Sequence, residues 1–308
     1  MNELRRSEPR AGFHASCTLA GLLGMCALAA GCCFFLAYRG AGAVTAVRNE
    51  AHRLFVAAER RKIELERIGR PRLTSAHFVV YYPRGFHHDA EIVDTTLEQY
   101  YPQVWKDYGL KEGTTHWPVV VESEREMVRT FGADPPIGAY WQGTLWFLAP
   151  SMWLAEGPSM ASAYAKDGPV PHELTHLTND IVGDGRVPIW LDEGLSQYED
   201  WELSGYVWYV PSRNSFSLPK YSWGQLTGNF YGLPDQPMAF RQVVAATAAI
   251  CRAGSGVCLK VVEQIGRGET AMTAIRSVLG QRAFVRWYRG LYWQIAGPVS
   301  GQEAGPTI

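Results

Sequence analysis

The chain has 308 residues, of which 47% are hydrophobic and 12% are aromatic. This length and composition suffice for one domain with a sizeable buried core plus short appendages. The formal net charge is −1 and no Gly-rich loop ends in Lys-Ser/Thr, so neither nucleic-acid binding nor P-loop phosphate binding is expected.

The N-terminal region contains a long apolar segment. Residues 1–14 form a tail with three arginines, and residues 15–38 carry no charged side chain. These 24 residues exceed the length of about 20 that a helix needs to cross a bilayer. Three interpretations are open: an uncleaved transmembrane anchor, a signal peptide cleaved at Ala43, and a lipoprotein signal cut before Cys32. The anchor fits the length best, because a signal peptide has a shorter apolar region.

The orientation of this segment is predicted from the cysteines, because equal numbers of basic residues lie on its two sides. Cys251 and Cys258 are the two cysteines outside the apolar segment. A disulfide between them would imply an oxidising compartment, whereas two reduced buried thiols are the alternative. We expect a single-pass membrane protein, of the bacterial inner membrane, whose main domain is periplasmic or extracellular.

Residues 45–70 are expected to form a juxtamembrane helix. Apolar residues recur at alternating steps of four and three from Val47 to Ile68, and Arg61 interrupts the series. Such a short heptad-like helix can pack on its own domain or pair with a second copy. The oligomeric state is therefore left undetermined.

Residues 73–297 are expected to form the main domain, and residues 298–308 a flexible tail. The β-branched and aromatic runs at residues 77–82 and 117–121 predict strands, with a helix between them. Residues 138–149 predict a hairpin or bent strand.

The second half of the domain is predicted to be helical. A polar, aromatic-rich connection over residues 204–222 leads to four helical patterns, which lie at residues 240–251, 257–265, 270–279 and 281–295. The expected fold class is therefore α+β, with a small sheet and an active-site helix followed by a helical C-terminal lobe. The cleft should lie between these two parts.

The sequence V-P-H-E-L-T-H-L-T-N-D at residues 170–180 predicts an active-site helix. His172 and His176 are four residues apart, so on a helix they project from one face and could share one zinc ion. Glu173 lies about 100° round the helix from His172, near enough to hold a metal-bound water without ligating the metal. Two solvated histidines on a surface helix are the alternative for this motif alone.

The sequence W-L-D-E-G-L at residues 190–195 supplies a further carboxylate. Glu193 lies seventeen residues beyond His176, after a Gly/Pro-rich turn that could fold a second helix back against the first. A catalytic zinc site has three protein ligands and one open position, and two His with one Glu is a ligand set of hydrolytic zinc peptidases. The two motifs together predict a metal site.

These motifs resemble those of the gluzincin zinc metallopeptidases, and most closely the bacterial peptidase MA-like domains, in which W-L-x-E-G-x-A/S follows H-E-x-x-H. The similarity extends loosely over residues 77–295, and the two motifs are its specific part. The resemblance implies a zincin-like fold, one Zn²⁺ held by His172, His176 and Glu193, and Glu173 as the general base. It also implies hydrolysis of a peptide or protein substrate by zinc-activated water. Endopeptidase activity is expected over aminopeptidase activity, because no G-x-M-E-N-type stretch is present.

Some roles stay open at this level. Phe240 stands where relatives often carry a tyrosine, which leaves the oxyanion donor undecided. The candidates for that role are Tyr140, Tyr164, Tyr198 and Tyr231. Asp180 and Asp192 could each hydrogen-bond a ligand imidazole or face solvent. The alternative function is a catalytically silent, membrane-anchored binding or scaffold protein that retains the zincin fold. Phe240 favours this alternative, and the intact Glu173 argues against it.

Overall fold

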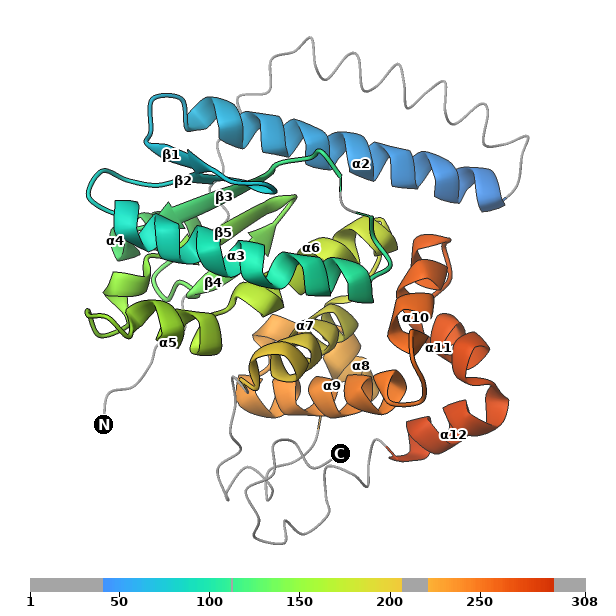
Figure 1. The fold of residues 1–308 in the computed structure, drawn as a ribbon. Helices are drawn as coiled ribbons and strands as arrows, with labels where there is room; N and C mark the ends of the chain where they lie inside the picture. Colours follow the sequence, from blue (N-terminus) through green and yellow to red (C-terminus); the bar gives the residue numbers. More distant parts are fainter. Residues whose placement is uncertain (1–40, 112, 207–220, 291–308) are drawn as a thin grey trace, which may run out of the picture.

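The computed structural model describes residues 41–111, 113–206 and 221–290 (Figure 1). Four expected segments lie outside the described residues: the N-terminal tail (1–14), the apolar segment (15–38), most of the polar connection (207–220) and the C-terminal tail (298–308). None of the described helices is long and apolar enough to cross a bilayer. The fold class is α+β, as expected, with one five-stranded sheet and a larger number of helices.

The sheet has the strand order β1-β2-β3-β5-β4. Its strands are β1 (Arg72–Thr74), β2 (Phe78–Tyr81), β3 (Trp117–Glu122), β4 (Gly138–Trp141) and β5 (Thr144–Leu148). The three central strands pair in parallel, and β1 and β4 pair antiparallel at the two edges. Strands β2 and β3 confirm the strands predicted at residues 77–82 and 117–121, because β-branched and aromatic side chains suit a buried sheet.

Strands β4 and β5 form the hairpin predicted for residues 138–149. The chain reverses at Gln142 and Gly143, whose φ angles of 48° and 83° are those of a two-residue type I′ turn. Gly143 has a second role, since a Cβ there would meet Val56 at 2.7 Å and Arg60 at 2.9 Å. The turn therefore allows the N-terminal helix to pass close to the sheet.

The helix expected over residues 45–70 is observed as α2 (Ala41–Glu66), which begins and ends four residues earlier. It lies along the outside of the domain (Figure 1). Asn49 and Arg53 both donate to the carboxylate of Asp184, each at 2.8 Å. His52 pairs with Asp180 at 2.7 Å. Helix α2 thus packs on its own domain through polar contacts to the end of the central helix.

Helix α3 (His87–Asp107) links β2 to β3 and covers one face of the sheet (Figure 1). Two shorter helices were not expected from the sequence, namely α4 (Glu124–Phe131) and α5 (Met160–Asp167), and a 3-10 turn, η1 (Pro150–Met152), follows β5. Helix α4 begins with a capping box in which Ser123 and Glu126 satisfy each other's backbone groups.

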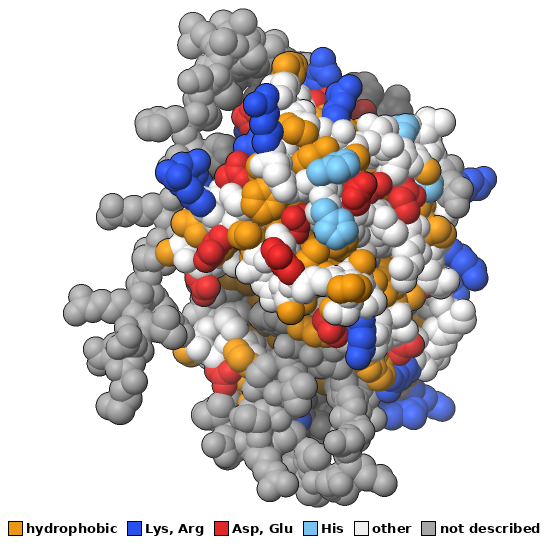
Figure 2. All heavy atoms as spheres, turned by 60° about the vertical axis from the view of Figure 1, so that its left-hand side comes forward, with side chains coloured by type: hydrophobic (Ala, Val, Ile, Leu, Met, Phe, Trp, Pro, Cys, Tyr) orange, Lys and Arg blue, Asp and Glu red, His pale blue; other side chains and the backbone are white. Residues whose placement is uncertain are grey.

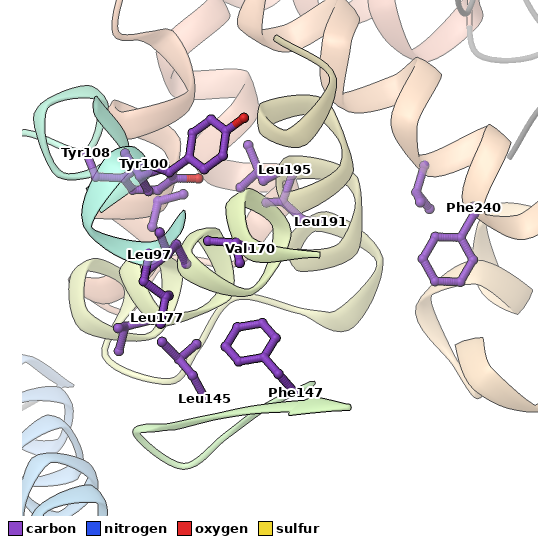
Figure 3. Close-up of a cluster of buried hydrophobic side chains, with 14 of the residues drawn as sticks. Leu97, Tyr100, Tyr108, Leu145, Phe147, Val170, Leu177, Leu191, Leu195 and Phe240 are labelled. Atoms are coloured by element: carbon purple, nitrogen blue, oxygen red, sulfur yellow. The ribbon is translucent and has the colours of Figure 1, made fainter. Parts of the chain in front are cut away.

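The centre of the molecule is α6 (Val170–Gly183), which α7 (Ile189–Ser204) flanks. Val170, Leu174 and Leu177 on α6 are at most 1% exposed. Figure 3 shows Val170 and Leu177 among apolar side chains of α3, β5 and α7, namely Leu97, Leu145, Phe147, Leu191 and Leu195. Fully burying one such side chain stabilises a fold by about 1.5–3 kcal/mol, so this packing holds α6 firmly in place.

The C-terminal lobe is helical, as expected. It consists of α8 (Trp223–Thr227), η3 (Phe230–Gly232), α9 (Gln236–Cys251), α10 (Val257–Gly266), α11 (Ala271–Leu279) and α12 (Gln281–Gly290). Cys251 at the end of α9 and Cys258 in the first turn of α10 form a disulfide, with their Cα atoms 5.0 Å apart. Of the two alternatives for these cysteines, the structure contains the disulfide.

The surface is mixed in charge. On the face drawn in Figure 2, the Lys and Arg side chains of the described residues lie mostly around the margin, while acidic side chains lie nearer the centre. The basic side chains in this view do not merge into one continuous patch.

Candidate metal centre and active site

Helix α6 presents two imidazoles on the side opposite its apolar face. His172 and His176 lie one turn apart, with ring centroids separated by 4.8 Å. Their Nε2 atoms are 3.1 Å from each other. The four-residue spacing and the burial of Val170, Leu174 and Leu177 together explain this orientation, because one face of the helix is held by the core.

Helix α7 brings a carboxylate to the same point. Oε2 of Glu193 lies 3.3 Å from Nε2 of His172 and 3.7 Å from Nε2 of His176. The next residue, Gly194, lies where α7 approaches α9, and a Cβ there would meet the carbonyl of Val243 at 2.8 Å and the side chain of Thr247. The glycine therefore lets α7 sit deep enough to place the carboxylate beside the imidazoles.

The spacing of these three donor atoms fits a tetrahedral zinc ion. At Zn–ligand bonds of about 2.0–2.1 Å, neighbouring ligand atoms of a tetrahedron are separated by about 3.3 Å. The observed separations of 3.1, 3.3 and 3.7 Å bracket that value. Two imidazole nitrogens and one carboxylate oxygen are also donors that zinc prefers. The structure thus brings together the three residues proposed as ligands from the sequence.

Asp192 and Asp180 have different roles. Oδ2 of Asp192 lies 2.9 Å from Nδ1 of His176, and its Oδ1 accepts a hydrogen bond from Asn179 at 2.7 Å. This contact places the proton on Nδ1 and leaves Nε2 free to face a metal. Asp180 instead pairs with His52 and accepts a hydrogen bond from Tyr140, so its carboxylate is directed away from the imidazoles. Asn179 was missed in the sequence, because only the packing of α7 on α6 brings Asp192 to it.

The charges of this cluster depend on one another. Burial would lower the pKa of His176, but the carboxylates of Asp192 and Glu193 outweigh it and raise the pKa to about 10. Burial would likewise raise the pKa of Glu193, but the two imidazoles and the Tyr231 hydroxyl lower it to about 2. The negative charge of Asp192 and Glu193 is therefore balanced by positive charge at the imidazoles, and a bound metal cation would supply that charge in place of the imidazole proton.

Glu173 lines the same cavity as the three donor residues. It is 5% exposed, and this burial raises the pKa of its carboxyl group. Gly138 on β4 leaves room for it, since a Cβ there would meet Pro169 at 2.6 Å and Oε1 of Glu173 at 3.0 Å. A buried carboxylate of raised pKa is suited to accept a proton and return it.

These groups line a cavity of about 750 Å³ between the sheet edge and the helical lobe. Gly138, Ala139 and Tyr140 of the edge strand β4 form one wall. Strand β4 pairs on one side with β5 and is last in the sheet order, so its other edge has no strand partner among the described residues. The cleft therefore lies where it was expected, between the sheet and the helical lobe.

Among the four tyrosines considered as oxyanion donors, Tyr231 is the one whose hydroxyl contacts a proposed ligand. It donates to Oε1 of Glu193 from η3. Tyr140 also lines the cavity, but its hydroxyl donates to Asp180, and Tyr164 is fully buried. Phe240 lines the cavity too and packs edge-on against Phe230, the neighbour of Tyr231.

Two buried polar residues of α7 also face the cavity and were not singled out in the sequence. Gln197 is 3% exposed and Asp200 is 2% exposed. Within the described residues, neither amide atom of Gln197 has a hydrogen-bond partner, a situation that costs about 1–3 kcal/mol per buried group. Asp200 accepts a hydrogen bond from Ser204 at 2.9 Å, and burial raises its pKa to about 7. These two residues could be recognised only after the structure had placed Glu193 beside the two imidazoles, because they lie in the same cavity.

Comparisons with protein-family models, with curated proteins and with solved structures give no match. The case for a metal centre therefore depends on the geometry of these side chains.

Proposed function

We propose that this protein is a zinc-dependent peptidase of the gluzincin type with a zincin-like fold. The observation that supports this most strongly is the set of donor separations among His172, His176 and Glu193, with the buried carboxylate of Glu173 beside them. A metal site that served structure alone would have four protein ligands and would not need an additional buried carboxylate in the same cavity.

The residues around the metal position have distinct tasks in hydrolysis. A zinc ion held by the two imidazoles and Glu193 would lower the pKa of a water towards about 7 and would polarise the scissile carbonyl. Glu173 accepts the proton of the attacking water and returns it to the leaving amine. Asp192 holds the His176 tautomer, and strand β4 pairs with the extended peptide. Tyr231 lines the cavity beside Glu193, and its hydroxyl would turn from Oε1 of Glu193 to donate to the developing oxyanion.

We further propose that the domain is attached to a membrane and lies outside the cytoplasm. The uncharged run over residues 15–38 supports a single-pass anchor, and the disulfide between Cys251 and Cys258 supports an oxidising compartment such as the periplasm or the cell exterior. The substrate would be a peptide or protein, with endopeptidase action preferred.

The alternative is a catalytically silent scaffold that keeps the same fold. Phe240, which replaces the tyrosine common in relatives, is the observation that favours it. Tyr231 weakens this argument, because it places a hydroxyl beside Glu193 from another element.

The test is metal content and peptide cleavage by the purified full-length chain. We expect about one zinc per chain in the wild type and in Glu173→Gln, with cleavage of a mixed peptide library by the wild type alone. The control is Glu124→Gln, which removes an exposed carboxylate outside the cleft and should retain cleavage. Zinc in both proteins with cleavage by neither would favour the scaffold. Absence of zinc from the wild type would contradict the metal centre itself.

A further inference from the structure

A row of polar side chains on α7 leads from the metal centre into the cleft. Glu193, Gln197 and Asp200 are spaced by four and three residues, so they lie on one face of the helix. All three are at most 5% exposed, and all three line the same cavity. Glu193 has a role at the metal centre, whereas the other two have none in the hydrolysis described above.

The side-chain amide of Gln197, which has no partner among the described residues, indicates that a ligand binds in the cavity. Its side chain is buried and lines the cavity, and both its Oε1 and its Nε2 lack a partner within the part of the chain that the structure describes. Buried amides in folded proteins nearly always satisfy their hydrogen-bonding capacity. A group that enters the cavity would supply the missing partner, and the Oε1 atom would accept from an N–H donor.

The charge of the cleft indicates the kind of donor. Three carboxylates line the cavity in addition to those at the metal centre, and they belong to Asp134, Asp167 and Asp200. No Lys or Arg belongs to the described residues that line it. Asp200 is buried, and Asp167 at the end of α5 is half-buried. Negative charge in a partly enclosed, low-dielectric cleft attracts cations.

Building on the proposed peptidase function, we propose that Gln197 and Asp200, with Asp167 nearer the surface, form a subsite for a cationic group of the substrate. An ammonium or guanidinium group carries N–H donors for both the Gln197 amide oxygen and the Asp200 carboxylate. The cation can be a Lys or Arg side chain or a free N-terminal amine. The subsite would thus make the protein selective for positively charged peptides.

Peptide binding to the full-length, zinc-loaded Glu173→Gln protein tests this independently of turnover. The probes are labelled pentaalanine peptides, acetylated and amidated, in which lysine or its neutral counterpart norleucine occupies each position in turn. A second pair compares pentaalanine with a free and an acetylated amino terminus. Fluorescence anisotropy gives Kd for each peptide. We expect lysine at one position, or the free amine, to improve binding about tenfold or more.

Variants in the same background then assign the preference to the subsite. Asp200→Asn should abolish the preference. Asp167→Asn, at a less buried position, should reduce it, and this variant provides the test if Asp200→Asn folds poorly. The matched control is Glu202→Gln, which removes an exposed charge from the same helix and should leave the preference intact. The same peptides are offered to the wild type to measure cleavage.

The outcomes separate the two proposals. Equal binding of charged and neutral peptides would overturn the subsite even if the wild type cleaves them. A preference that Asp200→Asn and Asp167→Asn leave unchanged would overturn it as well. A preference lost in Asp200→Asn would support the subsite even if the wild type cleaved none of the peptides. Absence of cleavage would count against the peptidase function and not against the subsite.

Discussion

Individual side chains of the candidate metal centre are held by contacts between α6 and α7. Asp192 on α7 bridges Nδ1 of His176 and the amide of Asn179, both on α6. Such a carboxylate orients the imidazole and increases its basicity, so its effect should appear in metal affinity.

We predict that Asp192→Asn weakens zinc binding by about 10–100-fold, because a neutral amide accepts a weaker hydrogen bond from Nδ1–H and so lowers the basicity of the ligating imidazole. Competition with a chelator measures this affinity directly. Asp180→Asn serves as the matched control. Asp180 lies on α6 one turn beyond His176, but its carboxylate contacts His52 and Tyr140 instead of His176. Equal weakening by both substitutions would argue against a specific role for Asp192.

The hydroxyl group of Tyr231 can be tested as the oxyanion donor. We predict that Tyr231→Phe lowers kcat by about 10²-fold with zinc content unchanged, because an oxyanion donor is lost. Steady-state kinetics on a zinc-loaded protein check this, with Tyr198→Phe as a control outside the cavity. Should Tyr231 serve only to position Glu193, zinc affinity would fall instead and the loaded variant would keep its kcat.

At the scale of the elements, the site depends on how closely α7 packs against its neighbours. On one side Gly194 allows contact with α9. Towards α3, the carboxyl of Glu199 shares a hydrogen bond with Asp107, and burial together with this neighbour raises the pKa of Glu199 to about 8. In an unfolded chain the pKa of a glutamate is about 4.3.

This difference in pKa predicts a pH-dependent stability. Between about pH 4.3 and 8 the folded protein holds a proton that the unfolded chain has released, so stability falls as pH rises and the loss is complete above pH 8. Glu199→Gln mimics the protonated acid. Its gain in free energy of unfolding should be larger at pH 9 than at pH 5 by on the order of 2–4 kcal/mol.

Urea unfolding at the two pH values measures this gain. Glu124→Gln, which changes an exposed carboxylate on α4, should show a small effect at both. A gain for Glu199→Gln that is the same at pH 5 and pH 9 would contradict a shared proton between α3 and α7.

At the scale of the whole molecule, α2 and the disulfide each join parts of the fold that lie outside the cavity lining. Helix α2 is anchored to the end of α6 through Asp180 and Asp184, so the segment that follows the apolar N-terminal run is part of the folded domain. The disulfide joins α9 to α10 within the helical lobe, at a sequence separation of 7.

We predict that Cys251 and Cys258 are oxidised in intact cells. Alkylation before cell lysis should leave both thiols unmodified, and a second label applied after reduction should modify both, as mass spectrometry of the peptide would show. Cys251→Ser provides the control, since it frees Cys258 for the first label. Modification of both thiols in the first step would place the domain in a reducing compartment.

Short-range spacing was enough to predict helix α6 and the face that carries its two histidines, because these features lie within one or two turns. The positions of His172, Glu173 and His176 follow from the helical period, and the strands at residues 77–82 and 117–121 follow from local composition. Helix α4 could also have been predicted, since Ser123 and Glu126 form a capping box that is visible in the sequence.

Tertiary packing decided which polar residues became partners. Asp180 and Asp192 are equivalent in the sequence, and only the rotation of α7 against α6 turns Asp192 towards His176. The same packing sets Tyr231 beside Glu193 and exposes Gln197 to the cavity. The physical reason is that helical periodicity specifies a face of one element, whereas a contact between elements depends on how their cores interlock.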